Sequence, residues 1–533
     1  MTISDAKLKI TNPVLPGFNP DPWMLRVGDD YYIATSTFEW FPGVAIYHSR
    51  DMVHWQLLTH PLSKAGQLDL LGVPSSGGIW APNLTYDNGT FYLLYTNVVG
   101  RKGVFKDLHN YLITAENIMG PWSEPIYLNA KGFDPAFFHD DDGRKWLMQM
   151  RWDFRTGRPR FSGILMQEYN HAEGRLVGEE SVIYRGTEIG VTEGPSMFKK
   201  DGYYYLITAE GGTGCNHAVT VARSRNIEGP YETAADNPMM TTAHDREHPL
   251  QNAGHAAFVE TQNGEWYISH LGIRVLPDGR RLNPLGRETF IQRIVWTEDG
   301  WPRLENGSRL PSLEVAAPGL ELHPFAPIPE RDDFDAPQLN IHFSTLRTPA
   351  DESWLSLQKR PGYLRLRGRE SLNSWHKQSM VARRVQHFEC EAETCVEFDP
   401  QSFFHMAGLV CYYDELDYYY LRISHDERLG KHIGVAQSVG GKYEELLDSF
   451  VIADGWERCY LRVTIERGVL QFAVSADGSS WSNIGPELDF GVLSDEYAGK
   501  LGFTGSMVGV CAQDMSGDGH HADFDYFTYR ERV

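Results

Sequence analysis

The chain has 533 residues, with 49 Lys and Arg against 71 Asp and Glu, a formal net charge of −22, and 12% Phe, Trp and Tyr. This length is roughly three times that of a common domain, so two domains are expected. So acidic a chain argues against nucleic-acid and anionic-membrane partners, which bind clustered Lys and Arg.

The first residues and the cysteines bear on the cellular location. Residues 1–10 lack the apolar core of a signal peptide, and no later segment has the composition of a membrane span. Six cysteines are too few and too scattered for a disulfide scaffold or a CxxC zinc site. We therefore expect a cytoplasmic protein whose cysteines are reduced.

Residues 1–315 contain a weak repeat of about 58 residues. Each copy has an apolar run, a turn rich in Gly, Asp or Asn, and an aromatic strand. Asn-Gly and Asp-Gly turns between apolar runs indicate hairpins, because both central residues need positive φ. The equivalent aromatic residues are Tyr32, Tyr92, Trp146, Tyr204 and Trp266. Five copies predict a five-bladed β-propeller, in which most aromatic rings are strand packing.

The rest of the chain is also expected to be all-β. A Pro-rich segment at 316–332 is typical of a semi-rigid linker. Residues 333–533 contain short alternating strands, such as 363–367 and 418–423. They predict a C-terminal β-sandwich of the jelly-roll type.

Equivalent positions in the five copies predict a pocket at one end of the propeller channel. The start of the first strand carries Asp21, Trp80 with Ala81, Asp134, Glu193 and His255. Three carboxylates from three blades would repel one another, so that one stays protonated while another is ionised. Glycosidic cleavage needs such a pair of acid and base. Structural turn caps and a hard-cation site are the alternatives, and no Asp-x-Asp run supports the cation site.

Long motifs in both domains resemble the β-xylosidases of glycoside hydrolase family 43. They are residues 18–22, 35–43, 77–82, 132–134, 192–195, 284–289, 330–335 and 523–527. The resemblance implies that Asp21 is the general base and Glu193 the general acid, with inversion of configuration. Asp134 would tune the pKa and the orientation of Glu193. Arg287 would contact sugar hydroxyls near the carboxylates.

The resemblance also implies the pocket walls. Phe38, Trp80 and Trp152 fall in motif segments that line the pocket in relatives, where rings stack on sugar C–H faces. A loop of the second domain, residues 502–508, is expected to close the pocket, with Met507 near a position that is aromatic in some relatives. His255 would lie at the pocket floor, where some members hold a divalent cation such as calcium. No cofactor is required and no metal ligand is assigned.

The expected function is an exo-acting, inverting glycosidase that releases xylose from the non-reducing ends of β-1,4-xylooligosaccharides, with side activity on α-L-arabinofuranosides. One alternative is an enzyme that acts mainly as an α-L-arabinofuranosidase. An invertase-type fructosidase is disfavoured, because the chain has Asn19-Pro20-Asp21-Pro22 and Glu193-Gly194 instead of Asn-Asp-Pro-Asn and Glu-Cys. A non-catalytic carbohydrate-binding propeller is the remote alternative. The partner is thus a xylooligosaccharide, and a homo-oligomer is left open.

Overall fold

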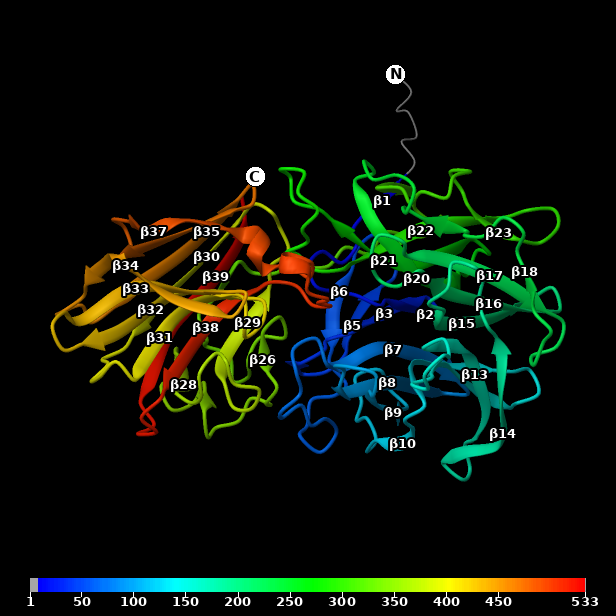
Figure 1. Cartoon of the computed structure of the whole chain (residues 1–533), viewed down its shortest axis with the longest axis horizontal. Coiled ribbons are helices and arrows are strands. Elements are labelled where there is room, and N and C mark those ends of the chain that lie inside the picture. Colours follow the sequence, from blue (N-terminus) through cyan, green and yellow to red (C-terminus); the bar gives the residue numbers. More distant parts are fainter. Residues whose placement is uncertain (1–7, 533) are drawn as a thin grey trace, which may run out of the picture.

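Five antiparallel sheets arranged around a common axis form the N-terminal part of the computed structural model, which describes residues 8–532 (Figure 1). This confirms the predicted five-bladed β-propeller. The first three blades are β2 (Trp23–Val27), β3 (Asp30–Thr35), β5 (Ala45–Ser49) and β6 (Gln56–Thr59); β7 (Gly78–Asp87), β8 (Thr90–Gly100), β9 (Asp107–Ala115) and β10 (Ile126–Asn129); and β11 (Gly132–His139), β12 (Lys145–Trp152), β13 (Phe161–Asn170) and β14 (Arg175–Tyr184).

The remaining blades complete the ring. They are β15 (Glu193–Lys200), β16 (Tyr203–Glu210), β17 (Ala218–Ser224), β18 (Glu232–Thr233) and β19 (Met240–Thr241); and β20 (Leu250–Glu260), β21 (Trp266–Arg274), β22 (Glu288–Trp296) and β23 (Pro302–Leu304). The ends of the propeller are joined by the pairing of β1 (Lys9–Thr11) with β24 (Glu314–Ala316).

The hairpin turns explain why the repeat folds into blades. Asn88 (φ 48°) and Gly89 (φ 83°) join β7 to β8, and Asp201 (φ 51°) and Gly202 (φ 75°) join β15 to β16. Positive φ at both central residues matches the right-handed strand twist. Most aromatic residues of the repeat pack inside the blades, since Tyr32, Tyr92 and Trp146 are buried and Tyr204 and Trp266 half-buried.

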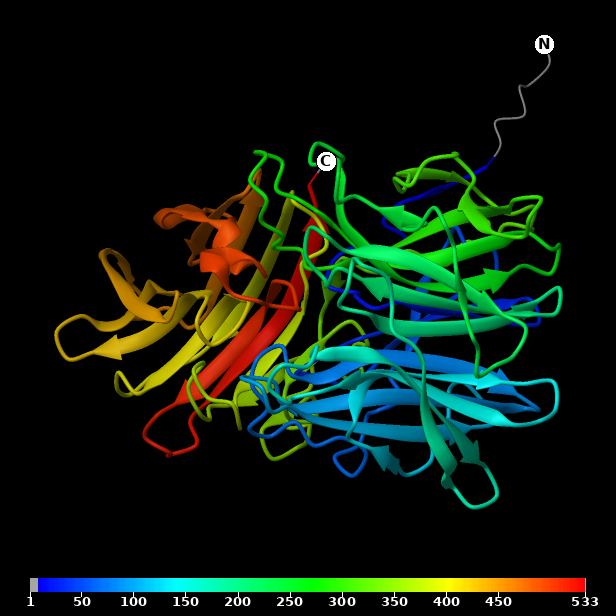
Figure 2. The same ribbon diagram turned by 45° about the vertical axis from the view of Figure 1, so that its right-hand side comes forward.

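Two eight-stranded sheets form the C-terminal β-sandwich, as predicted (Figure 2). One contains β25 (Arg331–Asp332), β27 (Leu355–Ser356), β28 (Leu364–Arg367), β39 (His521–Glu531), β30 (Cys390–Glu397), β35 (Cys459–Glu466), β36 (Val469–Ser475) and β37 (Ser482–Asp489). The other contains β34 (Lys442–Ile452), β33 (Gly430–Val439), β32 (Tyr418–Asp426), β31 (His405–Tyr412), β38 (Met507–Asp514), β29 (Ser379–Arg384), β26 (Ser344–Leu346) and β4 (Trp40–Phe41). The 3₁₀ helices η1 (Phe490–Leu493) and η2 (Tyr497–Gly499) precede β38.

The two domains share structure at their contact. Strand β4 comes from the propeller segment but pairs with β26 at the edge of a sandwich sheet. The guanidinium of Arg347, which is 1% exposed, donates from Nε to the carbonyl oxygen of Val73 at 2.7 Å. These contacts fix the sandwich against one end of the propeller. Within residues 8–532, no helix is long and apolar enough to cross a membrane.

Candidate active site

A pocket of about 400 Å³ opens between the propeller and the sandwich. Its walls contain all eight residues that the sequence singles out: Asp21, Phe38, Trp80, Asp134, Trp152, Glu193, His255 and Arg287. They come from all five blades, so the propeller brings together residues up to 266 positions apart.

The backbone at or near the first strand of a blade is irregular where a residue faces the pocket. Asp21 (φ 54°), Asp134 (φ 56°) and His255 (φ 53°) have left-handed backbone conformations. The ladder shifts register beside the pocket residues in β7, β11, β15 and β20. A bulge redirects a side chain, and a non-glycine residue held at positive φ costs about 1–3 kcal/mol. Three of the residues that face the pocket thus carry backbone strain, as do residues elsewhere in the chain such as Met52 and Arg467.

One blade differs by one residue from the predicted register. Its left-handed residue is Gly194 (φ 54°), so Glu193 lies one position before it, whereas Ala81 (φ 20°), beside Trp80, lies within the predicted register. Gly194 also lies against the imidazole of His255, because a Cβ at position 194 would be 3.0 Å from that ring. The glycine after Glu193 is therefore favoured by both its backbone conformation and the close approach of His255.

Asp21 is a buried carboxylate with a fixed counterion. Its Oδ1 accepts a hydrogen bond from Arg287 Nη1 at 2.9 Å, and its Oδ2 accepts one from Ser36 Oγ at 2.7 Å. Burial alone would raise the pKa of Asp21, but the positive charge of Arg287 and the Ser36 hydrogen bond bring it below its ordinary value. Asp21 is therefore ionised at neutral pH.

Asp134 and Glu193 have the opposite tendency. Burial, and then the negative charge of Asp21, raise the pKa of Asp134 to about 8. Burial and the charges of Asp134 and Asp21 raise the pKa of Glu193 well above its ordinary value. Asp134 Oδ2 accepts a hydrogen bond from the Gly194 backbone N–H at 3.0 Å, which fixes the peptide next to Glu193. The pocket thus holds an ionised carboxylate beside protonated carboxyl groups.

The histidines of the pocket are neutral. Burial lowers the pKa of His255, and burial together with the nearby His255 lowers that of His217 to about 3. His217 Nδ1 lies 3.2 Å from the carbonyl oxygen of Asn252, which fixes that ring. Arg287 is therefore the main positive charge beside the carboxylates.

Aromatic rings form one continuous wall of the pocket. Neighbouring ring centroids are 5.3–6.2 Å apart along the series Phe38, Trp80, Phe133, Phe161 and Trp152. Such rings present apolar faces against which the C–H face of a sugar can pack.

The sandwich also contributes to the pocket wall, but not through Met507. Met507 is 1% exposed and packs in an apolar cluster shared by the two domains, whereas Phe503, four residues earlier, lines the pocket. The Phe503 ring lies 5.3 Å from Trp80 and its carbonyl oxygen accepts a hydrogen bond from Arg287 Nη2 at 3.1 Å. The sequence motif located the loop, and the structure identifies Phe503 as its residue in the pocket wall.

Some pocket residues carry no sequence signal that singled them out. Thr213 Oγ1 lies 3.2 Å from Arg287 Nη1, and Lys106 lies on Trp152, with its ammonium 4.9 Å from the ring centroid. Ser36, which donates to Asp21, lies within the motif at residues 35–43. Of these three residues it is therefore the one that the sequence could most readily have identified.

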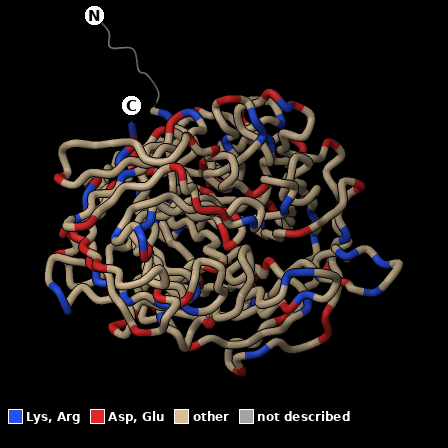
Figure 3. Tube along the Cα trace, turned by 60° about the vertical axis from the view of Figure 1, so that its left-hand side comes forward, with Lys and Arg blue, Asp and Glu red and all other residues tan. Residues whose placement is uncertain are grey.

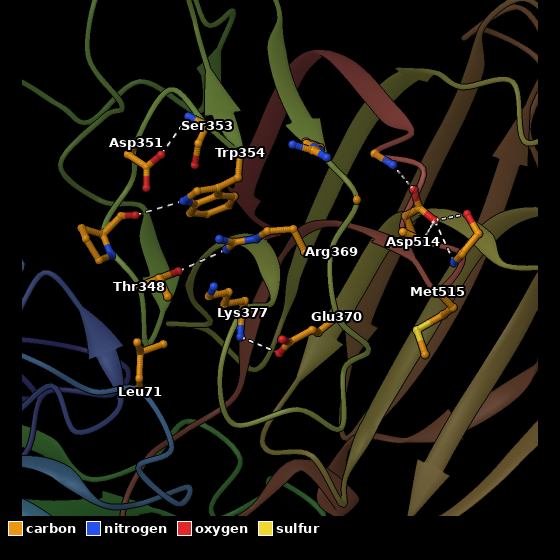
Figure 4. A pocket seen from close by; sticks show the side chains of 16 residues that line it. Leu71, Thr348, Asp351, Ser353, Trp354, Arg369, Glu370, Lys377, Asp514 and Met515 are labelled. Atoms are coloured by element: carbon orange, nitrogen blue, oxygen red, sulfur yellow. Dashed lines mark hydrogen bonds between the residues drawn. The ribbon is translucent and has the colours of Figure 1, made fainter.

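A larger hollow of about 690 Å³, lined mostly by the sandwich, contains none of Asp21, Asp134 and Glu193 (Figure 4). Two of its charged groups are already engaged. Arg369 stacks on Trp354 with its guanidinium carbon 4.1 Å from the ring centroid, and Asp514 accepts hydrogen bonds from the backbone N–H groups of Ser516, Gly517, Gly519 and His520. The smaller pocket is therefore the candidate active site.

Comparison with known proteins agrees with this geometry. Residues 10–302 match "Glycosyl hydrolases family 43", and residues 331–530 match "Beta xylosidase C-terminal Concanavalin A-like domain". The chain is 48% identical to a beta-xylosidase of Bacillus subtilis (98% of this chain, 100% of the relative) and 45% identical to xylosidase/arabinosidase 43B of Humicola insolens (98% of each).

A crystal structure gives the same result for the fold. The xylan beta-1,4-xylosidase of Bacillus halodurans C-125 is 56% identical and superposes with a TM-score of 0.97, covering 98% of this chain and 100% of that one. Both predicted domains thus have counterparts in one enzyme family. The chain belongs to glycoside hydrolase family 43.

Proposed function

We propose that this glycosidase is an exo-acting, inverting β-xylosidase that releases xylose from the non-reducing ends of β-1,4-xylooligosaccharides. The observation that carries the proposal is the electrostatic contrast between Asp21 and Glu193 in one pocket. An ionised carboxylate and a protonated carboxyl are the two groups that glycosidic cleavage requires. The relatives named as xylosidases support xylose as the sugar.

In this proposal Asp21 is the general base. Its carboxylate takes a proton from the water that attacks the anomeric carbon, while Arg287 and Ser36 fix its orientation. Glu193 is the general acid and gives its proton to the departing sugar oxygen. Asp134 keeps the pKa of Glu193 high and holds the adjacent Gly194 N–H. Water and leaving group are on opposite faces of the sugar, so configuration inverts in one displacement.

The pocket walls support cleavage at a chain end. Arg287 donates towards sugar hydroxyls and His255 lies at the floor, while Phe38, Trp80 and Trp152 offer ring faces to the sugars. Phe503 of the sandwich extends the aromatic wall beside Phe38 and Trp80. An internal sugar of a long chain would have to pass through that wall, so a terminal sugar fits better.

We further propose side activity on α-L-arabinofuranosides. The Humicola insolens relative carries both activities in its name. An enzyme that is mainly an α-L-arabinofuranosidase stays the alternative, and the ratio of kcat/KM on aryl β-xyloside and aryl α-L-arabinofuranoside distinguishes the two. A carbohydrate-binding propeller without catalytic activity is disfavoured, because the pocket pairs an ionised Asp21 with a protonated Glu193.

Two measurements test the mechanism. Proton NMR of fresh product from xylobiose should show α-xylose before mutarotation, and β-xylose first would refute inversion. Glu193→Gln should lose about 10²–10⁴-fold in kcat on xylobiose, the usual contribution of acid catalysis, but far less on an aryl xyloside whose leaving group needs no proton. Equal losses on the two substrates would contradict the role of Glu193.

We propose that this hydrolysis needs no cofactor, because acid and base are both supplied by side chains. Calcium prefers about six to eight oxygen ligands. The groups near His255 include the guanidinium of Arg287 and the ring of His217, and Asp21 is already paired. These residues do not fit calcium at His255. Activity unchanged by a chelator is the expected result, and loss of activity that calcium restores would contradict it.

The domain bounds, the cellular location and the oligomeric state are also proposals. The domains are 1–315, a linker at 316–332 and 333–533, of which residues 1–7 and 533 lie outside the described residues. A cytoplasmic location is supported by six free cysteines, five of them buried. A homo-oligomer is supported by the edge strand β34, which exposes Leu447 (72%) and Phe450 (44%). Light scattering of the purified chain tests the last.

A further inference from the structure

Two exposed aromatic rings lie next to the outer end of the pocket's aromatic wall. Phe105 is 70% exposed and Phe154 is 53% exposed, and their ring centroids are 5.2 Å apart. Phe105 belongs to the connection between β8 and β9, and Phe154 to the connection between β12 and β13. Paired large rings left in water are a feature of binding surfaces more than of a packed core.

The same two connections supply residues that line the pocket. Lys106 follows Phe105, and Trp152 precedes Phe154 by two positions. The connections are joined by a hydrogen bond from Trp152 Nε1 to the carbonyl oxygen of Val104 at 2.9 Å. The exposed pair therefore adjoins the series of rings that starts at the buried Phe38 and ends at Trp152. A sugar chain that leaves the pocket along this wall meets Phe105 and Phe154 next.

The connections are also strongly basic. Residues 101–106 and 153–160 contain six Lys and Arg residues against the single acid Asp153, in a chain of net charge −22. Figure 3 shows acidic and basic residues interspersed along most of the chain. Asp153 is occupied by Arg155, with Nη2 to Oδ2 at 2.6 Å. Within residues 8–532, neither Lys102 nor Arg158 has a carboxylate within 4 Å. These cations are available to an external anion.

We propose that Phe105, Phe154 and the surrounding cations form a subsite for the second sugar of the leaving group, and that the subsite favours oligosaccharides with a uronic acid on that sugar. A ring face packs on the C–H face of the sugar, and the carboxylate of the substituent meets the guanidinium and ammonium groups. The inference rests on the proposed xylosidase function, because it assigns the terminal xylose to the pocket and the rest of the chain to the wall.

Three substrates test it: xylobiose, xylotriose, and xylotriose with glucuronic acid on its reducing-end unit. The native enzyme should give the highest kcat/KM on the acidic trisaccharide, and that advantage should shrink between low and high NaCl because salt screens exposed charges. In Phe105→Ala/Phe154→Ala, the ratio of kcat/KM on xylotriose to that on xylobiose should fall roughly two- to tenfold, the range of one aromatic contact.

Matched variants serve as controls. Phe403→Ala/Phe404→Ala removes another exposed pair, 51% and 42% exposed, from the sandwich and should leave the ratio unchanged. Arg158→Gln should reduce the advantage of the acidic trisaccharide, whereas Arg428→Gln, an exposed arginine on the β32–β33 turn, should not.

The outcomes that overturn the inference are distinct from failure of the proposed function. An acidic trisaccharide cleaved no faster than xylotriose overturns it, as does an unchanged ratio in Phe105→Ala/Phe154→Ala. A fall in molecular mass of that variant in solution would show that the pair is a contact between copies, and would also overturn it. If the native enzyme does not cleave xylobiose at all, the proposed xylosidase function fails first.

Discussion

Replacing Arg287 by Met should raise the pKa of Asp21, the carboxylate that we propose as the general base. Arg287 is 6% exposed, and its side chain is held by Asp21 Oδ1 at 2.9 Å, Thr213 Oγ1 at 3.2 Å and the Phe503 carbonyl oxygen at 3.1 Å. Met has a similar length and keeps apolar contacts with the Phe38 and Phe503 rings, but it carries no charge. The substitution thus isolates the effect of the guanidinium.

The magnitude follows from Coulomb's law. Two unit charges about 4 Å apart attract by about 4 kcal/mol at an effective dielectric constant of about 20. Removal of one partner of a buried pair costs about 3–5 kcal/mol, in agreement with that figure. In Arg287→Met, the Ser36 hydrogen bond still opposes burial, but the positive charge is gone and the pKa of Asp21 rises. About 4 kcal/mol corresponds to about three pKa units. The acidic limb of kcat/KM should move up by about that amount, so we expect kcat/KM at pH 5 to fall about 10–10²-fold and to recover as pH rises.

Stability should change with pH in a direction that can be worked out. In the native enzyme the pKa of Asp21 lies below its ordinary 3.8, so the ionised group stabilises the fold above that value and the contribution is lost on acidification. In the variant the folded pKa is raised, so its contribution is present at low pH and is lost as pH rises. The difference in unfolding free energy between native enzyme and variant should therefore grow from about pH 3 to pH 7.

Urea unfolding at several pH values and the pH profile of kcat/KM measure both effects. Arg293→Met is the control, because Arg293 pairs with Glu265 at 3.1 Å and Glu305 at 2.6 Å in the same blade but outside the pocket. The control should keep the acidic limb of the activity profile in place. An unmoved acidic limb in Arg287→Met, with a stability difference independent of pH, would refute the assignment of Arg287 as the group that keeps Asp21 ionised.

Two further substitutions probe the walls of the pocket. Gly194→Ala should cost about 1–2 kcal/mol of stability and at least about tenfold in kcat, because it strains a left-handed residue and puts a Cβ 3.0 Å from His255. Gly89→Ala is the control for strain alone, because Gly89 has φ 83° and open space around it. Equal losses of kcat in the two variants would contradict the steric argument. Phe503→Ala should lower kcat/KM on xylobiose about tenfold, chiefly through KM, since it removes a ring 5.3 Å from Trp80. Steady-state kinetics measure this, and an unchanged KM would show that the ring does not contact substrate.

Local sequence patterns predicted the parts of the molecule that local physics determines. The repeat predicted the blades because Asn88-Gly89 and Asp201-Gly202 dictate their own hairpins. The positive φ of Asp21, Asp134 and His255 was not predicted, although Asp and His are among the residues that tolerate it. The position of a bulge depends on how a strand packs against the neighbouring blades of the propeller, and no single copy of the repeat contains that information.

Contacts between domains were the least predictable. The closing loop was located at 502–508, but the choice between Phe503 and Met507 depends on where β38 begins. Because β38 starts at Met507, that side chain is buried where the sheet meets the propeller, and Phe503 lies in the preceding irregular segment that reaches the pocket. A one-residue shift in a strand reverses which face its side chains occupy, so the motif alone cannot assign the residue.

The sandwich contributes to the charge of the pocket as well as to its shape. The Phe503 carbonyl oxygen holds Arg287 Nη2 while Arg287 Nη1 holds Asp21, so a backbone group of one domain orients the counterion of the other. A guanidinium released from that carbonyl would be free to turn from Asp21 towards water. Burial would then raise the pKa of Asp21 as it does that of Asp134. The division of protonation states that hydrolysis needs is therefore a property of the two domains together.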